Sequence, residues 1–119
     1  AEGAGLAHYA LGAAFRQKGY FAEALREYRL AAEKGEPNEL VQQAMAEVLL
    51  LQQDAPAAIA IYDQLLRSQP HAAKLWNERG VALHQTGDVA GAEASYRRAI
   101  SADPVYAFSH NNIGVVRVQ

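Results

Sequence analysis

Residues Trp76–Pro104 read WNERGVALHQTGDVAGAEASYRRAISADP, and this stretch decides the fold. Gly87 suits the left-handed residue that ends a helix, and the carboxylate of Asp88 can cap the start of the next one. The pattern predicts one helix from about Ala73 to Thr86 and a second that runs to about Ala102. The second helix should stop at Asp103-Pro104, because the residue before a proline avoids helical geometry.

The same arrangement returns along the chain at a constant interval. A small residue recurs in the first helix of each repeat, and an alanine and a tyrosine recur in the second. A fixed period of roughly 34 residues marks a solenoid of stacked helical hairpins. The small residues should let helices approach closely, and the tyrosines can fill the space between one hairpin and the next. These structural repeat positions are Gly12, Ala46, Gly80 and Gly114, then Ala24, Ala58 and Ala92, then Tyr28, Tyr62 and Tyr96.

The period predicts a single repeat domain over residues 5–119, after an N-terminal extension of residues 1–4. Its last part, from Ala107 to Gln119, supplies a first helix without a second. The apolar face of that helix would be partly uncovered, whereas terminal repeats normally end in a polar face. We therefore expect either that the protein continues beyond Gln119 or that this end associates with another copy. The repeats are residues 5–38, 39–72 and 73–106, followed by the partial repeat 107–119.

These residues resemble the tetratricopeptide-repeat (TPR) family, whose pattern is W-x2-L-G-x2-Y, then A-x3-F, then P. The resemblance implies an all-α fold, a right-handed α-α superhelix (TPR solenoid) of about seven antiparallel helices. It also implies that the first helices of successive repeats line a concave groove. In the third repeat the pattern is carried by Trp76, Gly80, Leu83, Ala92, Tyr96 and Pro104.

In this family, ligands usually lie in that groove, so the resemblance also indicates a binding surface. The positions expected there mix aromatic, aliphatic and amide side chains, and an amide can bond the backbone of an extended peptide. We therefore expect a non-enzymatic scaffold that binds a peptide or partner protein. The predicted groove residues are Tyr9, Ala13, Arg16, Gln43, Glu47, Leu50, Asn77, Val81, His84, Phe108, Asn111 and Val115.

A chaperone tail is not the expected ligand. The chaperone-binding members hold a carboxylate with Lys and Asn on the first groove helix, Asn on the second, and Lys and Arg on the third. Only Lys74 agrees with that set, and Glu78 reverses the charge that is needed. An Hsp70 or Hsp90 tail is therefore not predicted. The matching positions are Tyr9, Ala13, Ala44, Lys74 and Glu78.

The composition and motifs exclude several function classes. The 119 residues carry a net charge of -2, which argues against nucleic acid, because its binders usually carry a basic stripe. The absence of cysteine excludes disulfides and thiolate sites, and the longest apolar run is too short to span a membrane. No histidine pair or HExxH motif predicts a metal site, and neither a catalytic constellation nor a cofactor motif is present. The compartment stays open between cytoplasm and periplasm.

Two other functions remain open. Asn111-Asn112-Ile113-Gly114 resembles the Asn-x-Gly repeats of O-linked N-acetylglucosamine transferases, so the chain could be the arm of a larger enzyme such as a glycosyltransferase. Those transferases line their groove with a row of asparagines. In this chain the row is not continuous, because the position of Asn112 is occupied in the other repeats by Ala10, Ala44 and Glu78. The uncovered C-terminal face would instead suit a self-assembly module. The alanine- and glutamine-rich, lysine-poor composition is typical of bacterial repeats.

One pair of positions changes in concert. Leu11 and Leu25 are both apolar, and so are their counterparts Met45 and Ile59. The third repeat has Arg79 and Glu93 at these two positions. Because both residues change from apolar to opposite charge, we predict that they touch across the hairpin as a partly buried ion pair. The alternative is that they are two unrelated substitutions at the edge of the surface.

Overall fold

The computed structural model describes residues 3–35 and 38–106 of the chain. Over these ranges the fold is all-α, as predicted, and no strand occurs within them. The seventh predicted helix, together with Phe108, Asn111, Gly114 and Val115, lies outside the described residues. The helices are α1 (Ala4–Gln17), α2 (Phe21–Glu33), α3 (Asn38–Leu51), α4 (Ala55–Ser68), α5 (Ala73–Gln85) and α6 (Val89–Ala102).

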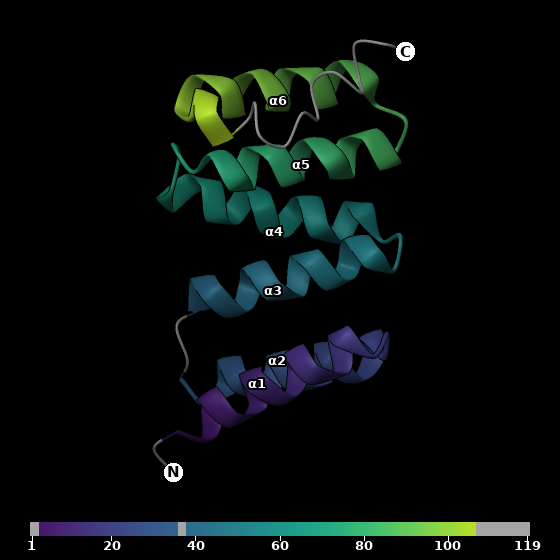
Figure 1. The fold of residues 1–119 in the computed structure, drawn as a ribbon, viewed down its shortest axis with the longest axis vertical. Helices are drawn as coiled ribbons and strands as arrows, with labels where there is room; N and C mark the ends of the chain where they lie inside the picture. The colour runs from purple at the N-terminus through teal and green to yellow at the C-terminus, as the bar shows by residue number, and fades with distance from the viewer. Residues whose placement is uncertain (1–2, 36–37, 107–119) are drawn as a thin grey trace. The chain divides into compact units, whose positions relative to one another are not determined.

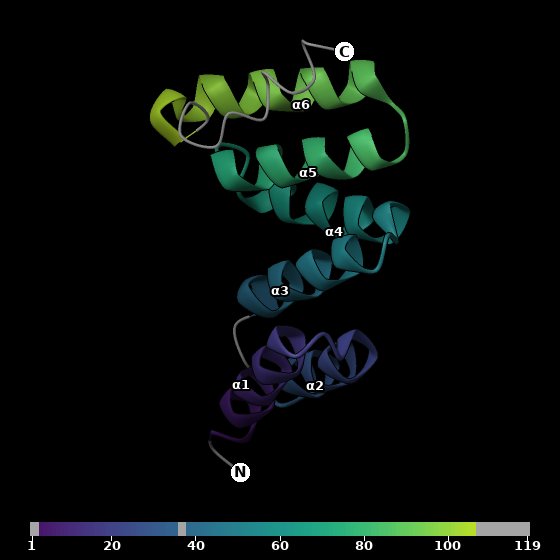
Figure 2. The same cartoon turned by 45° about the vertical axis from the view of Figure 1, so that its right-hand side comes forward.

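The helices belong to two compact units, Ala1–Asp54 and Ala55–Gln119. In the first unit α1 packs on α2, and α2 packs on α3. In the second unit α4 packs on α5 and α5 packs on α6, with successive helices antiparallel (Figure 1). The turned view in Figure 2 shows the short connection that folds α6 back along α5. Each unit therefore contains one complete predicted hairpin, α1–α2 in the first and α5–α6 in the second, together with one helix of the middle repeat.

The turns inside the three hairpins share one backbone geometry. Gly19, Gln53 and Gly87 occupy the same position in successive repeats, and all are left-handed, with φ of 83°, 65° and 89°. After each of them the chain closes a hydrogen bond back to the preceding helix, for example from Asp54 N to Leu49 O at 2.8 Å. This is the Schellman ending, which favours glycine because a Cβ atom is strained at positive φ. Glycine predicts this geometry at two of the turns, whereas the glutamine at position 53 does not predict it.

Replacing Gln53 with glycine is expected to stabilise the chain by about 1 kcal/mol, because it removes the strain of a side chain at positive φ. Thermal or urea unfolding followed by circular dichroism measures the change. Gln52→Gly is the matched control, since Gln52 does not have a positive φ and glycine there only adds chain entropy to the unfolded state. A Gln53→Gly variant no more stable than the Gln52→Gly variant would contradict the expectation.

The helix ends in the third hairpin form as the sequence predicts. The predicted helix Ala73–Thr86 is observed as Ala73–Gln85, and α6 ends at Ala102 as expected. The carboxylate of Asp88 accepts a hydrogen bond from Gly91 N at 2.9 Å, which caps the start of α6. Asp103 is extended and follows the last helical residue. Asp88 therefore marks the start of α6 and Asp103 its end, as predicted from the sequence.

The hairpin core explains the alternation of small and aromatic residues. A Cβ atom on Gly80 would lie 2.4 Å from a ring atom of Tyr96, and one on Gly12 would lie 2.7 Å from the ring of Tyr28. Each glycine therefore makes room for a tyrosine ring of its own hairpin, which the sequence argument did not foresee. The hydroxyl of Tyr62 does reach the following helix, where it donates to Glu78 Oε1 at 2.7 Å. The alanines Ala24, Ala58 and Ala92 are fully buried.

Candidate functional site

The first unit brings together predicted groove residues from two different helices. Arg16 on α1 and Glu47 on α3 form an ion pair, with 3.5 Å between Arg16 Nη2 and Glu47 Oε1. Both side chains keep contact with solvent, at 44% and 22% exposure. Their contact places the two helices on one shared surface, which we call the α1/α3 face. Its members are Tyr9, Ala13, Arg16, Gln43, Glu47 and Leu50, all of them exposed or half-buried.

Tyr9 is held in this face by the core beneath it. Its ring lies 5.7 Å from the ring of Tyr28, measured between centroids, in a tilted arrangement. Burial raises the pKa of the Tyr28 hydroxyl, an effect that Arg16 opposes and that Tyr9 and Glu47 reinforce. Tyr9 presents a half-buried aromatic ring of fixed position, which is the kind of anchor that binding surfaces use.

A hollow of about 540 Å³ adjoins Arg16 at the end of α1. Its wall combines two cations, Arg16 and Lys18, with the apolar side chains of Phe21 and Leu51. Leu51 is 49% exposed although it is large and apolar. The hollow therefore offers charge and apolar surface beside the α1/α3 face. Gln17 and Gly19 complete its lining.

The predicted groove residues of the second unit lie on α5 and differ in exposure. Val81 and His84 are half-buried. Asn77 is only 6% exposed, so its amide has almost no surface to offer a ligand. Asn77 is therefore a buried polar side chain that interacts with other groups of the protein.

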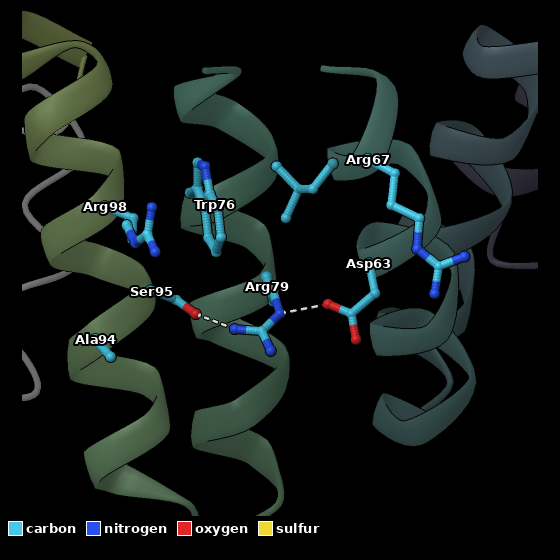
Figure 3. Close-up of a pocket in the computed structure, with 8 residues that line it drawn as sticks. Asp63, Arg67, Trp76, Arg79, Ala94, Ser95 and Arg98 are labelled. Carbon is cyan, nitrogen blue, oxygen red and sulfur yellow. Dashed lines mark hydrogen bonds and ion pairs between the residues drawn. The ribbon is translucent and has the colours of Figure 1, made fainter. Parts of the chain in front are cut away.

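A separate cleft of about 570 Å³ lies in the second unit, where residues of α4, α5 and α6 line it. We call it the arginine cleft. Figure 3 shows its side chains extending from the three helices, with Arg98 and Arg67 at opposite sides. Leu66 and Ala94 supply apolar surface in its lining. The polar and aromatic lining residues are Asp63, Arg67, Trp76, Arg79, Ser95 and Arg98.

Arg79 is fixed at the centre of the arginine cleft. Its Nε donates to Asp63 Oδ1 at 2.6 Å, and its Nη1 donates to Ser95 Oγ at 2.7 Å. Ser95 is 1% exposed, so this hydrogen bond satisfies a buried hydroxyl. The three residues come from α5, α4 and α6, and Arg79 ties these helices together (Figure 3).

This geometry shows that the predicted Arg79–Glu93 ion pair is wrong. Glu93 instead accepts from Arg97 of its own helix, with 2.7 Å to Nη2. Arg79 points to Asp63 and Ser95, so the residue facing it across the hairpin is position 95. The joint change at positions 79 and 93 therefore reflects two separate partners, one in the cleft and one on the helix surface.

Trp76 forms the aromatic wall of the arginine cleft. Its Nε1 donates to Pro70 O at 2.8 Å, which fixes the orientation of the indole ring. The guanidinium carbons of Arg79 and Arg98 lie 5.8 Å and 5.2 Å from the ring centroid. Both distances fall within the range of a cation–π interaction. The ring thus lies close to one arginine that is fixed by hydrogen bonds and to one that is exposed.

Comparison with known proteins identifies the fold family. A family model described as tetratricopeptide repeat matches residues 44–107, which is more than half of the chain. The chain belongs to the tetratricopeptide-repeat family. No curated protein matches the sequence significantly.

Solved TPR structures superpose on nearly the whole chain. The first TPR of Spaghetti (RPAP3), bound to the HSP90 peptide SRMEEVD, matches with a TM-score of 0.83 at 15% identity, covering 98% of this chain and 93% of that one. The Sgt2 TPR domain from Aspergillus fumigatus gives 0.81 at 17% identity, with 95% and 76% covered. MamA from Desulfovibrio magneticus RS-1 gives 0.83 at 16% identity, with 98% and 66% covered. At these identities the similarity shows the TPR fold.

The residues of the arginine cleft are not among the predicted site residues, although the TPR pattern contains a signal for them. Arg79 occupies the leucine position of W-x2-L-G, where the first two repeats have Leu11 and Met45. Trp76 and Arg79 have the i, i+3 spacing of helical neighbours, and so do Ser95 and Arg98, so each pair shares one helix face. A charge at an apolar TPR position, next to the aromatic position, is the observation that could have revealed the cleft.

Proposed function

We propose that this TPR protein is a non-enzymatic interaction scaffold whose α1/α3 face binds a peptide or partner protein. The Arg16–Glu47 ion pair carries the proposal, because it joins groove positions of two successive repeats on one surface. That surface combines the ring of Tyr9, which packs on Tyr28, with the small exposed side chain of Ala13. Such a mixture of anchors and polar groups is typical of binding surfaces.

The proteins of similar fold support an interaction role. TPR domains with this fold are protein-interaction modules, and the RPAP3 domain is bound to an HSP90 peptide. Within residues 3–35 and 38–106, no three metal-ligating side chains gather into a group, and no helix there has the length and apolar character to cross a membrane. The α1/α3 face has half-buried aromatic and amide groups of the kind that bind peptides.

We do not assign an Hsp70 or Hsp90 tail as the ligand. Glu78 stands where the chaperone-binding TPR domains need a cation. Its carboxylate accepts the hydroxyl of buried Tyr62 and lies 3.9 Å from Lys74 Nζ. These contacts keep the negative charge of Glu78 beside Lys74, the single lysine that matches the chaperone-binding set. The carboxylate of Glu78 would repel the carboxylate of a bound tail.

Affinity capture from the lysate of the source organism tests the proposal. An Ala13→Arg variant places a long charged side chain in the middle of the α1/α3 face and should reduce capture of the partner at least about fivefold. Ala14→Arg is the matched control, because Ala14 is also exposed on α1 but lies about 100° around the helix. Mass spectrometry would quantify the captured proteins. Capture that survives Ala13→Arg, or that both variants abolish equally, would contradict binding at this face.

A further inference from the structure

The arginine cleft of the second unit collects positive charge in a chain that is negative overall. Three arginines and one aspartate line it, so its formal charge is 3 − 1 = +2, whereas the whole chain carries -2. Its volume of about 570 Å³ is in the range of ligand sites. The cleft therefore calls for an anionic ligand larger than a single ion.

Two of the three arginines remain available for a ligand. Arg79 is already paired with Asp63 and bonded to Ser95. Arg67 and Arg98 are exposed, and neither forms an ion pair within the described ranges. The next residue along α6, Arg97, is by contrast engaged by Glu93. The free charge of the cleft thus resides on Arg67 and Arg98.

The positions of these two arginines define the shape of the ligand. Arg98 extends from α6 and Arg67 from α4, and Trp76 stands between them on α5 (Figure 3). One phosphate would need guanidinium groups that converge on one point. Two separated cations with an aromatic surface between them instead match two carboxylates on either side of an apolar side chain.

We propose that the arginine cleft binds an acidic segment of a partner protein. One carboxylate pairs with Arg98 and another with Arg67, and an apolar side chain between them packs on Trp76. Arg79 acts as a fixed wall, because its bonds to Asp63 and Ser95 set its position before a ligand arrives. The cleft lies wholly in the second unit, so this binding is separate from that at the α1/α3 face.

The test uses the fluorescence of Trp76, which is the single tryptophan of the chain. The probe is the blocked pentapeptide DELED, and its uncharged counterpart NQLQN is the reference peptide. DELED should change the fluorescence in a saturable way and bind at least about tenfold more tightly than NQLQN. Binding should also weaken as salt is raised, because exposed ion pairs are screened.

Variants locate the binding site within the second unit. Arg98→Gln and Arg67→Gln should each weaken DELED binding about fivefold, as expected for an exposed charge pair. Arg97→Gln is the matched control, since it removes the same charge one residue away, and should change the affinity less than about twofold. Circular dichroism would show whether the variants stay folded, which is expected because all three side chains are exposed.

Several outcomes would overturn the proposal. The first is the absence of any fluorescence change with DELED up to about 1 mM, a concentration at which weak binding is still detectable. The second is equal binding of NQLQN and DELED. The third is a loss of DELED affinity with Arg97→Gln as large as that with Arg98→Gln. Displacement of DELED by a single-stranded oligonucleotide or by inorganic phosphate at lower concentration than DELED itself would reassign the cleft to another anion.

Discussion

Truncating Tyr96 to alanine is expected to lower the free energy of unfolding by about 4 kcal/mol. The ring is 3% exposed and packs with Ala92 against Val81 and Leu83. Gly80 lies beneath it and has no side chain that could move into the space. The cavity would therefore persist, so the cost should fall within the full range of about 3–5 kcal/mol for buried aromatic residues. Urea unfolding followed by circular dichroism at 222 nm measures the loss.

The fluorescence of Trp76 provides a second probe of the same hairpin, because Trp76 and Gly80 lie on α5. Two probes are needed, since repeats can unfold separately in a solenoid. Tyr96→Phe is the control, because it keeps the ring and should cost less than about 1 kcal/mol. A loss below about 1.5 kcal/mol for Tyr96→Ala would show that the hairpin can close around the space.

The regular parts of the fold follow from local sequence signals. Asp88 caps its helix through a bond to its own near neighbour, and Asp103-Pro104 ends one through backbone sterics. Such signals act within a few residues and can be recognised from sequence alone. The left-handed turn at Gln53 carries no such signal, because glutamine is not among the residues that favour a positive φ. The repeat period predicts that turn only after the geometry at Gly19 and Gly87 is known.

The side-chain partners could be predicted less well. A joint change from apolar to charged was interpreted as a contact between positions 79 and 93, but the period cannot say which way a long side chain turns. Arg79 has two acceptors on two neighbouring helices, and the one within its own hairpin is Ser95. Arg16 and Glu47 do meet, because equivalent faces of successive repeats lie side by side. The arginine cleft needs side chains from three helices, whereas the sequence signals only the charge of Arg79 beside Trp76 on one of them.

The glycine beneath Tyr96 gives the second large effect. Gly80→Leu is expected to destabilise the chain by about 3 kcal/mol, because its Cβ atom alone would lie 2.4 Å and 2.6 Å from two ring atoms. Leucine is a better helix former than glycine, but that gain of about 1 kcal/mol does not offset the clash. Ala14→Leu, at an exposed position of α1, controls for a leucine added where no ring lies opposite. A Gly80→Leu variant as stable as the original chain would show that the ring can move aside.

The two substitutions should compensate each other when combined. In the double variant Gly80→Leu with Tyr96→Ala, the new leucine occupies the space that the tyrosine ring leaves, so neither the cavity nor the clash remains in full. Because the two residues are in contact, their effects should not add, and the double variant should be at least about 2 kcal/mol more stable than the sum of the single losses predicts. Urea unfolding of all four proteins gives this coupling energy directly. Simple additivity of the two losses would mean that position 80 requires glycine for a reason other than contact with the Tyr96 ring. The equal spacing of the pairs Gly80–Tyr96 and Gly12–Tyr28 would then not result from packing between glycine and tyrosine.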